Sequence, residues 1–279
     1  MKITVAQSAG FCLGVKRALE ITFRTVESGG NIEMLGDIVH NEDVVKQINQ
    51  AGIKKVKALR RGKNKIVLIR AHGVGLDIIK EASRLGYKII DATCPMVKEI
   101  HQIASNMEGK GYQIIIIGDK LHSEVIGITG QLKTKVIVID SLRKIPYTQI
   151  RRIKKAAVVV QSTQDMENVL KIAEILKSLI KDLKFFNTIC MPTRLKQKEI
   201  RKMPQENDVM IIIGSKTSAN TKRLYEISKS LNPRTYWIQS RREIKPAWLR
   251  RAAKVGITAG SSTPNATTQE VIKYLEKIK

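Results

Sequence analysis

The segment Ile114-Ile115-Ile116-Ile117-Gly118-Asp119-Lys120-Leu121-His122-Ser123-Glu124 changes abruptly from an apolar run to a polar one. The four isoleucines predict a short β-strand, and the glycine and polar residues after them predict a loop at its carboxyl end. Upstream, Val97, Ile100 and Ala104 have the three- and four-residue spacing of a helix face. Strands that alternate with helices indicate parallel βαβ sheets, so the segment predicts the α/β class.

The same order of strands and helices occurs three times along the chain. We therefore predict three related α/β modules, at residues 1–90, 91–186 and 187–279. The predicted strands are Ile3–Ala6, Ile32–Leu35 and Lys65–Ile69 in the first module, and Lys88–Ile90, Ile114–Ile117 and Ala156–Val160 in the second. For the third module they are Phe185-Phe186, which leads to Cys190, followed by Val209–Ile213 and Val255–Thr258.

The three cysteines occur once in each repeat, and each is followed 28 residues later by a polar residue at a strand end. These pairs are Cys12 with His40, Cys94 with His122, and Cys190 with Ser218. Functional residues of parallel α/β sheets gather at the carboxyl ends of the strands. The register therefore predicts that three thiolates converge, although a single cysteine is often only a small buried hydrophobe.

The composition is that of a globular protein, with 43% hydrophobic and 27% charged residues. We expect no membrane span and no signal peptide, and hence a cytoplasmic protein. Three cysteines far apart argue against a disulfide framework. The net charge of +25 would attract phosphates, nucleic acid or acidic proteins, but it also fits basic residues scattered over solvated faces. Aromatic residues make up 4%, which is few for stacking on nucleic acid, so we expect no such partner.

Three thiolates can hold a metal centre of a particular kind. Zinc sites usually use close Cys-x-x-Cys pairs, which the chain lacks. A 4Fe–4S cluster normally takes four thiolates, so with three ligands one iron is open and can polarise a substrate oxygen. Basic residues four places after each cysteine could offset cluster charge or be ordinary surface residues; they are Lys16, Lys98 and Arg194.

Histidines and hydroxyl residues occupy the other strand ends. Three of the four histidines lie at such positions, whereas His101 falls on a helix and is interpreted as structural or as a support of the site. The third module supplies hydroxyls and an amide instead. This set of donors suits a phosphate or diphosphate. Its members are His40, His72, His122, Ser218, Asn220 and Ser262. The chain has no P-loop and no dinucleotide fingerprint, so a nucleotide cofactor is unsupported.

Glu124 is the carboxylate of greatest interest, because it lies two residues after His122 in the same loop. One interpretation is a solvated acid at a helix start, where acids are favoured. The other is a proton donor whose pKa is raised by enclosure near an anionic substrate.

The motifs together resemble the 4-hydroxy-3-methylbut-2-enyl diphosphate reductases, the LytB-type enzymes that end the methylerythritol phosphate route to isoprenoids. The likeness runs in collinear order from about residue 3 to about residue 275. It rests on Gly10-Phe11-Cys12-x-Gly14-Val15, Val39-His40-Asn41, Ala71-His72-Gly73-Val74, Asp91-Ala92-Thr93-Cys94-Pro95, His122-x-Glu124-Val125, Thr188-Ile189-Cys190, Gly214-Ser215-Lys216-x-Ser218-x-Asn220 and Thr258-Ala259-Gly260-x-Ser262-x-Pro264.

The resemblance implies a trefoil of three α/β domains around a central 4Fe–4S cluster with three cysteine ligands and one open iron. It implies that Cys12, Cys94 and Cys190 bind the cluster, that Glu124 is the proton source, and that ferredoxin or flavodoxin supplies electrons. The reaction would be reductive loss of the allylic hydroxyl. The residues implied to bind the allylic diphosphate are His40, His72, His122, Ser162, Thr163, Ser218, Ala219, Asn220 and Ser262.

Some positions depart from the usual motifs of this family. Gln161-Ser162-Thr163 replaces Gln-Thr-Thr and keeps the hydroxyl, whereas Ala219 replaces a serine and can contribute only its backbone. His122-Ser123-Glu124 replaces His-Pro-Glu. None of these changes removes a group that the chemistry needs.

Two other functions fit parts of the sequence. A basic nucleic-acid-binding protein would be colourless, and its binding to RNA would fall steeply with salt. A zinc hydrolase with histidine ligands would contain zinc and stay active in air. Anaerobic purification with a visible spectrum separates both from an iron–sulfur reductase.

Overall fold

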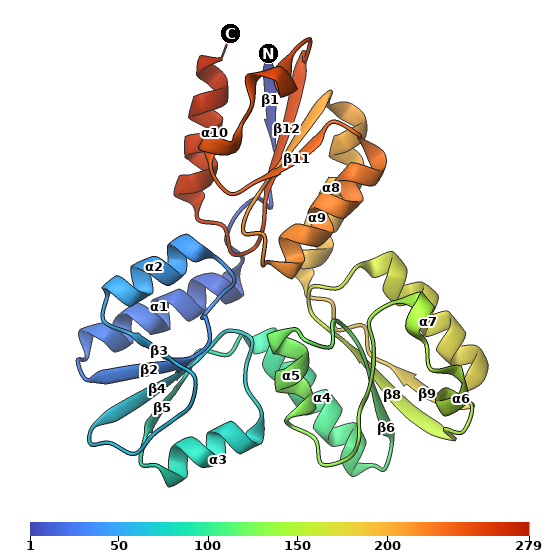
Figure 1. Cartoon of the computed structure of the whole chain (residues 1–279). Helices are drawn as coiled ribbons and strands as arrows, with labels where there is room; N and C mark the ends of the chain where they lie inside the picture. Colours follow the sequence, from blue (N-terminus) through green and yellow to red (C-terminus); the bar gives the residue numbers. More distant parts are fainter. Residues whose placement is uncertain (279) are drawn as a thin grey trace. The chain divides into compact units, whose positions relative to one another are not determined.

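The computed structural model describes residues 1–278, which pack into two compact units. Unit 1 consists of Met1–Lys16, Val39–Lys46 and the residues from Met191 onward. Unit 2 consists of Arg17–Ile38 and Gln47–Cys190. In both units strands alternate with helices, and every paired strand is parallel to its neighbours (Figure 1). Over the described part of the chain, no helix has the length and apolar character needed to cross a bilayer.

Unit 1 is built on one four-stranded sheet, sheet A, with the strand order β1-β12-β10-β11. The strands are β1 (Lys2–Val5), β10 (Val209–Ile213), β11 (Thr235–Ile238) and β12 (Lys254–Ala259). The helices are α8 (Met191–Glu206), α9 (Ala219–Leu231) and α10 (Asn265–Lys277), with 3-10 turns η2 (Arg241–Glu243) and η3 (Pro246–Leu249).

The alternation of side chains along β10 explains how helices cover both faces of sheet A. Met210 and Ile212 are fully buried against α8 and α9, where they contact a cluster that includes Ile200. Ile211 points to the opposite face and packs with Val271 of α10. Figure 1 shows α10 on one side of this sheet and α8 and α9 on the other. Because both faces of sheet A are buried, β10 needs apolar side chains at every position, without alternating polar residues.

Unit 2 contains two four-stranded sheets, sheet B in the order β3-β2-β4-β5 and sheet C in the order β7-β6-β8-β9. The strands of sheet B are β2 (Asn31–Leu35), β3 (Lys54–Val56), β4 (Lys65–Ile69) and β5 (Lys88–Asp91). Those of sheet C are β6 (Gln113–Ile117), β7 (Ile137–Ile139), β8 (Lys155–Val160) and β9 (Asp182–Phe185). The helices are α3 (Leu76–Arg84), α4 (Pro95–Gly109), α5 (Ser123–Thr129), α6 (Tyr147–Ile150) and α7 (Met166–Leu179), with the 3-10 turn η1 (Leu142–Lys144). Two helices, α1 (Leu13–Glu27) and α2 (Glu42–Gln50), have residues in both units.

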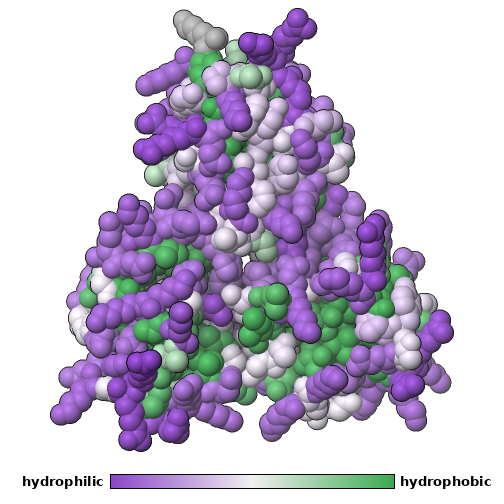
Figure 2. Space-filling view, viewed as in Figure 1, coloured by the Kyte–Doolittle hydropathy of each residue, from purple (hydrophilic) through white to green (hydrophobic). Residues whose placement is uncertain are grey.

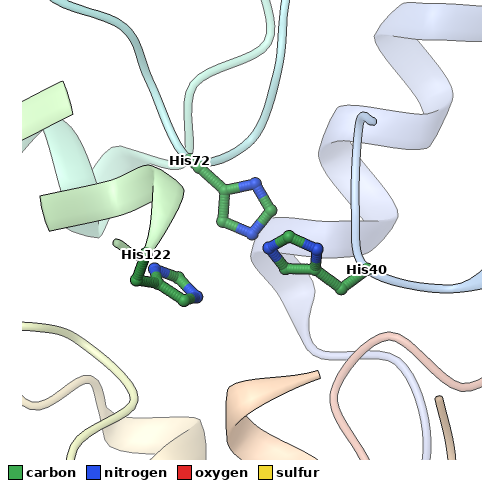
Figure 3. A group of neighbouring side chains, drawn as sticks. All are labelled: His40, His72 and His122. Atoms are coloured by element: carbon green, nitrogen blue, oxygen red, sulfur yellow. The ribbon is translucent and has the colours of Figure 1, made fainter. Parts of the chain in front are cut away.

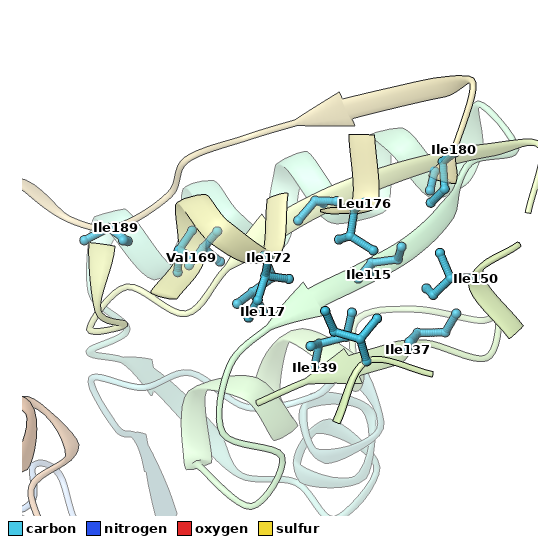
Figure 4. Packing of buried hydrophobic residues seen from close by; sticks show 14 residues of the cluster. Ile115, Ile117, Ile137, Ile139, Ile150, Val169, Ile172, Leu176, Ile180 and Ile189 are labelled. Carbon is cyan, nitrogen blue, oxygen red and sulfur yellow. The ribbon is translucent and has the colours of Figure 1, made fainter. Parts of the chain in front are cut away.

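Sheet C has a core on each face, as the isoleucine run in β6 requires. Ile115 and Ile117 pack against α7, where Ile172 is fully buried (Figure 4). Ile114 and Ile116 face the other way and pack against α4 and α5. The α/β class with parallel sheets is thus confirmed, and the strand expected at 114–117 extends by one residue to Gln113.

The strand before each cysteine pairs with strands that come earlier in the chain or at its far end. β5 pairs with β4 in sheet B, β9 pairs with β8 in sheet C, and β1 pairs with β12 in sheet A. The helix after Cys94, α4, packs on sheet C. The Cys94 loop therefore joins two sheets of unit 2. The module limits at residues 90 and 186 stay a prediction.

Three strands were not anticipated from the sequence: β3, β7 and β11, each at the edge of its sheet. β3 and β7 are only three residues long, and two residues of β3 are exposed lysines. Short edge strands bury little apolar surface, so they give a weak periodic signal.

The visible surface is mostly hydrophilic (Figure 2), in keeping with 50 basic and 25 acidic residues. A hydrophobic patch lies over α5 in the same view. There Ile126 is 53% exposed, and Leu121, in the loop before α5, is 89% exposed. Hydrophilic residues therefore cover most of the face seen in Figure 2, with hydrophobic patches between them.

Candidate functional site

Each cysteine lies in the short loop between a strand and the first turn of a helix. Cys94 is the N-cap of α4 and is followed by Pro95 at the first helical position. Cys12 and Cys190 directly precede α1 and α8. All three thiols are partly buried. The backbone N–H groups of a helix N-terminus favour negative charge, so these positions suit thiolates.

A repeated backbone hydrogen bond anchors the three cysteine loops. Cys94 N donates to Ala71 O at 3.0 Å, Cys190 N to Ser162 O at 3.1 Å, and Cys12 N to Ser261 O at 3.2 Å. Each acceptor directly precedes a residue that the sequence assigns to the substrate. Those residues are His72, Thr163 and Ser262. The threefold register predicted from the sequence therefore appears in the backbone, within unit 2 for two of the loops and within unit 1 for the third.

Two of the predicted histidines meet in unit 2. The rings of His72, after β4, and His122, before α5, are 5.5 Å apart between centroids and nearly perpendicular (Figure 3). His122 is the N-cap of α5, and its Nδ1 accepts a hydrogen bond from Glu124 N at 3.2 Å. Nδ1 as acceptor places the proton of the neutral ring on Nε2, which makes Nε2–H a donor.

Glu124 is buried, with 2% of its surface exposed, and it does not have the solvated position of an ordinary helix-start acid. Its Oε1 accepts from Ser162 N at 2.6 Å and its Oε2 accepts from Ser162 Oγ at 2.7 Å. Because Cys190 N binds Ser162 O, the carboxyl group and the Cys190 loop share one residue as their connection. Both oxygens of this carboxyl group are therefore held by Ser162.

Thr163 is positioned by the side chain of its neighbour Gln161. Gln161 Nε2 donates to Thr163 Oγ1 at 3.0 Å, and Gln161 Oε1 accepts from Asp119 N at 2.8 Å. Gln161 is fully buried, so it connects the loop after β8 with the loop after β6. The amide thus fixes the loop that carries two predicted substrate residues.

The predicted hydroxyl and amide groups of the third repeat lie in unit 1. Ser218 caps α9, where its Oγ accepts from Thr221 N at 3.3 Å, and Ala219 follows as the first helical residue. Ser262 Oγ donates to His40 O at 2.9 Å, so the backbone of the His40 loop and Ser262 are neighbours. Asn220 is 5% exposed, and its Nδ2 has no hydrogen-bond partner among the described residues. A buried amide donor without a partner is costly, and it points to a ligand that accepts from it.

His101 packs directly beneath the loop that carries His72. A side chain on Gly73, which has φ +72°, would meet His101 Cε1 at 2.8 Å. Burial lowers the pKa of His101 to about 4, against a smaller opposing effect of Asp91. The ring is therefore neutral at physiological pH and acts as packing for the loop, in agreement with its interpretation as structural or supporting.

Lys98, one of the basic residues that follow the cysteines, is bound to Asp91 with a 2.5 Å distance between Nζ and Oδ2. Burial opposes the charged form of Asp91, but the hydrogen bonds from Lys98 and Thr93 outweigh it and lower the pKa of Asp91. Lys98 therefore serves first as the partner of an acid in the strand before Cys94.

Comparison with known proteins agrees with this geometry. The family model described as LytB protein matches residues 3–276. The chain belongs to the LytB family. A 4-hydroxy-3-methylbut-2-enyl diphosphate reductase of Geobacter metallireducens is 39% identical over all of this chain and 98% of the relative, and one of Aquifex aeolicus is 38% identical over 99% and 96%.

Two solved structures are similar to this LytB family member. One, described as (E)-4-hydroxy-3-methyl-but-2-enyl diphosphate reductase, the terminal enzyme of the non-mevalonate pathway, has a TM-score of 0.74, 37% identity and full coverage of both chains. The other, E-1-hydroxy-2-methyl-but-2-enyl-4-diphosphate reductase of Plasmodium falciparum, has a TM-score of 0.91 and 26% identity over 99% of this chain and 88% of the other. The family predicted from the motifs is thus confirmed.

The sequence reasoning missed two residues that support the LytB site. Gln161 positions Thr163, and Lys196 of α8 binds the backbone near Cys12. Lys196 had a detectable signal, because a lysine at that register replaces an apolar residue of the other repeats. Gln161 also had a signal, because it is the first residue of the Gln161-Ser162-Thr163 motif, but the motif did not reveal that its side chain holds Thr163.

Proposed function

We propose that the chain is a 4-hydroxy-3-methylbut-2-enyl diphosphate reductase. The reaction consumes two electrons and two protons, breaks the allylic C–O bond, releases water, and yields isopentenyl and dimethylallyl diphosphates. The observation that carries the proposal is the shared backbone anchor of the three cysteine loops, each placed beside a predicted substrate residue. Membership of the LytB family and the reductase names of its relatives support it.

The donor set fits an iron–sulfur cofactor. Three partly buried thiols precede helix N-termini, where thiolates are favoured. Cys12, Cys94 and Cys190 would hold one 4Fe–4S cluster, in the middle of three α/β modules of residues 1–90, 91–186 and 187–279. Such a cluster would supply the electrons and one iron without a protein ligand.

The diphosphate would be bound by donors that the chain presents in several loops. The Nε2–H of His122 and the Nδ2 of Asn220 are donors suited to phosphate oxygens. We assign the same task to the other predicted residues: His40, His72, Ser162, Thr163, Ser218, Ala219 through its backbone, and Ser262. A cluster of short polar side chains on rigid strand ends orients the substrate before reaction.

Glu124 would deliver a proton to the leaving hydroxyl. Its carboxyl group contacts Ser162 Oγ, so a proton can pass directly or through that hydroxyl. Burial of Glu124 excludes bulk water from the donor, which limits competing proton loss.

The electron donor would be a ferredoxin or flavodoxin, and the site of action the cytoplasm. The net charge of +25 supports an acidic carrier as partner, because opposite charge speeds association. We expect no nucleic-acid partner.

The test is anaerobic purification followed by iron and sulfide analysis, a visible spectrum, and turnover of the allylic diphosphate with a chemical reductant. We expect about four iron and about four sulfide ions per chain, and formation of both products. A colourless zinc protein, or salt-dependent RNA binding without iron, would overturn the proposal. Cys94→Ser should lose the cluster, whereas the control Met96→Ala, at an exposed residue in the first turn of the same helix, should keep it.

A further inference from the structure

Lys196 is the largest charged side chain in the interior of unit 1. It lies on α8 and is 2% exposed. Its ammonium donates to three backbone carbonyls: Ser8 O, Gly10 O at 3.1 Å and Ala259 O at 2.9 Å. Three acceptors match the three N–H donors of a lysine. The ammonium is therefore held in a defined place.

The three carbonyls belong to two loops that matter for the proposed reaction. Ser8 and Gly10 lie between β1 and Cys12, and Ala259 ends β12 three residues before Ser262. β1 and β12 are neighbours in sheet A, so their carboxyl ends leave the same edge. The ammonium group of Lys196 therefore connects these two loops by hydrogen bonds to both of them.

A second residue of α8 completes the hold on the first loop. Glu199 Oε1 accepts from Gln7 N at 3.0 Å, and its Oε2 accepts from Ser8 N at 3.2 Å and from Ser8 Oγ. The carbonyl of Ser8 is thus bound by Lys196 while its N–H is bound by Glu199. Helix α8 therefore fixes the peptide groups on both sides of Ser8.

The register of the repeats shows that packing does not demand a charge here. Lys196 is six residues after Cys190, and the residues six after the other cysteines are Ala18 and Ile100. These are 0% and 1% exposed, as an apolar core position requires. Burying a cation is unfavourable unless hydrogen bonds compensate for its lost hydration, and an apolar side chain at the same position avoids that cost. The lysine therefore serves a task that the other two helices do not need.

We propose that Lys196 is a positioning residue that fixes the Cys12 loop and the Ser262 loop relative to each other and supplies a buried positive charge beside the Cys12 ligand position. The proposal rests on the proposed function for the role of these loops. The positive charge favours the more negative state of a neighbouring group. Hence it should raise the reduction potential of a cluster bound at the Cys12 loop.

Three variants of the full chain separate position from charge. Lys196→Met removes both the charge and the hydrogen bonds. Lys196→Gln keeps two donors without the charge, and Lys196→Arg keeps the charge. The control is Lys198→Met, because Lys198 is an exposed lysine on the same helix.

The first measurement is amide hydrogen exchange of the metal-free protein. Lys196→Met should speed exchange in residues 8–12 and 259–262 at least about tenfold, since hydrogen bonds to a charged group are strong, and leave β6 and β8 unchanged. Unchanged exchange in these loops, or an equal rise throughout the chain, would overturn positioning. If Lys196→Met does not fold, Lys196→Gln is measured instead. It should also speed exchange in residues 8–12 and 259–262, but less than Lys196→Met, and unchanged exchange there would again overturn positioning.

The second measurement is the midpoint potential of the reconstituted cluster. Lys196→Gln should shift it to more negative values, while Lys196→Arg and Lys198→Met should match the wild-type chain. A potential that Lys196→Gln leaves unchanged would overturn the role of the charge. If the wild-type chain assembles no cluster, the proposed function fails, and the exchange measurement still decides whether Lys196 positions the loops.

Discussion

Replacing Glu124 by glutamine tests the proton donor with little change in shape. Glutamine can still accept from Ser162 N through Oε1. Its Nε2–H can donate to Ser162 Oγ, because a hydroxyl both donates and accepts. Both contacts with Ser162 are therefore conserved in Glu124→Gln, and we expect a loss of unfolding free energy below about 1 kcal/mol.

The catalytic effect of Glu124→Gln should be much larger than its structural effect. An amide cannot deliver the proton, and general acid catalysis contributes at least about 10²-fold. We therefore expect turnover to fall at least about 100-fold with unchanged iron content. The assay is anaerobic turnover of the allylic diphosphate with a chemical reductant, together with thermal unfolding of the same preparations.

Two further variants make the result decisive. Glu270→Gln changes an exposed acid on α10 and should behave as the wild-type chain. Ser162→Ala removes one hydrogen bond to Glu124 but keeps the carboxyl group, so its loss should be smaller than that of Glu124→Gln. Turnover of Glu124→Gln within a few-fold of the wild-type value, at full iron content, would refute the assignment.

Three more predictions concern stability. The unfolded chain protonates His101 near pH 6.5, but the folded chain protonates it only at about pH 4. The free energy of unfolding should therefore fall as pH falls through this range, by up to roughly 3 kcal/mol. Urea unfolding of His101→Leu at several pH values should lack this pH-dependent loss. Gly130→Ala should cost about 1–3 kcal/mol by overpacking, because its Cβ would lie 2.6 Å from Gly75 Cα. Tyr87→Phe should cost about 1–3 kcal/mol, because it removes a 2.5 Å hydrogen bond to buried Glu33.

Matched controls exist for two of these three variants, Gly130→Ala and Tyr87→Phe. Gly109→Ala lies at the end of a helix with nothing within 4 Å of the added Cβ, and should be neutral or stabilising. Tyr147→Phe changes a tyrosine that is 45% exposed and should be neutral. A stability curve of His101→Leu that still falls as steeply as the wild-type curve below pH 6.5 would contradict the assignment of that slope to His101.

The parts of the fold that the sequence predicted are those with strong local patterns. The isoleucine run of β6 has no polar alternation, and its two buried faces explain why. The cysteine register was equally local, since it required only equal spacing in three repeats. The edge strands β3, β7 and β11 escaped prediction because each is short and buries little apolar surface.

Within the candidate site, the sequence predicted residue types but not their contacts. Glu124 was ambiguous between a solvated helix-start acid and an enclosed one, and only the fold places it against Ser162, 38 residues away. His101 was interpreted as structural, yet its contact with Gly73 depends on how α4 packs beneath a different loop. Such contacts join segments that are distant along the chain, and no local period encodes them.

By itself the sequence determined the α/β class, the threefold repeat, the cysteine positions and the family. These follow from apolar periodicity, residue spacing and motifs, which are properties of short segments. Tertiary structure alone decided that β1 pairs with β12, that Lys196 is buried between the Cys12 and Ser262 loops, and that Glu124 and the Cys190 loop share Ser162. The physical reason is that parallel strands are joined by crossovers, so neighbours in a sheet can lie at opposite ends of the chain.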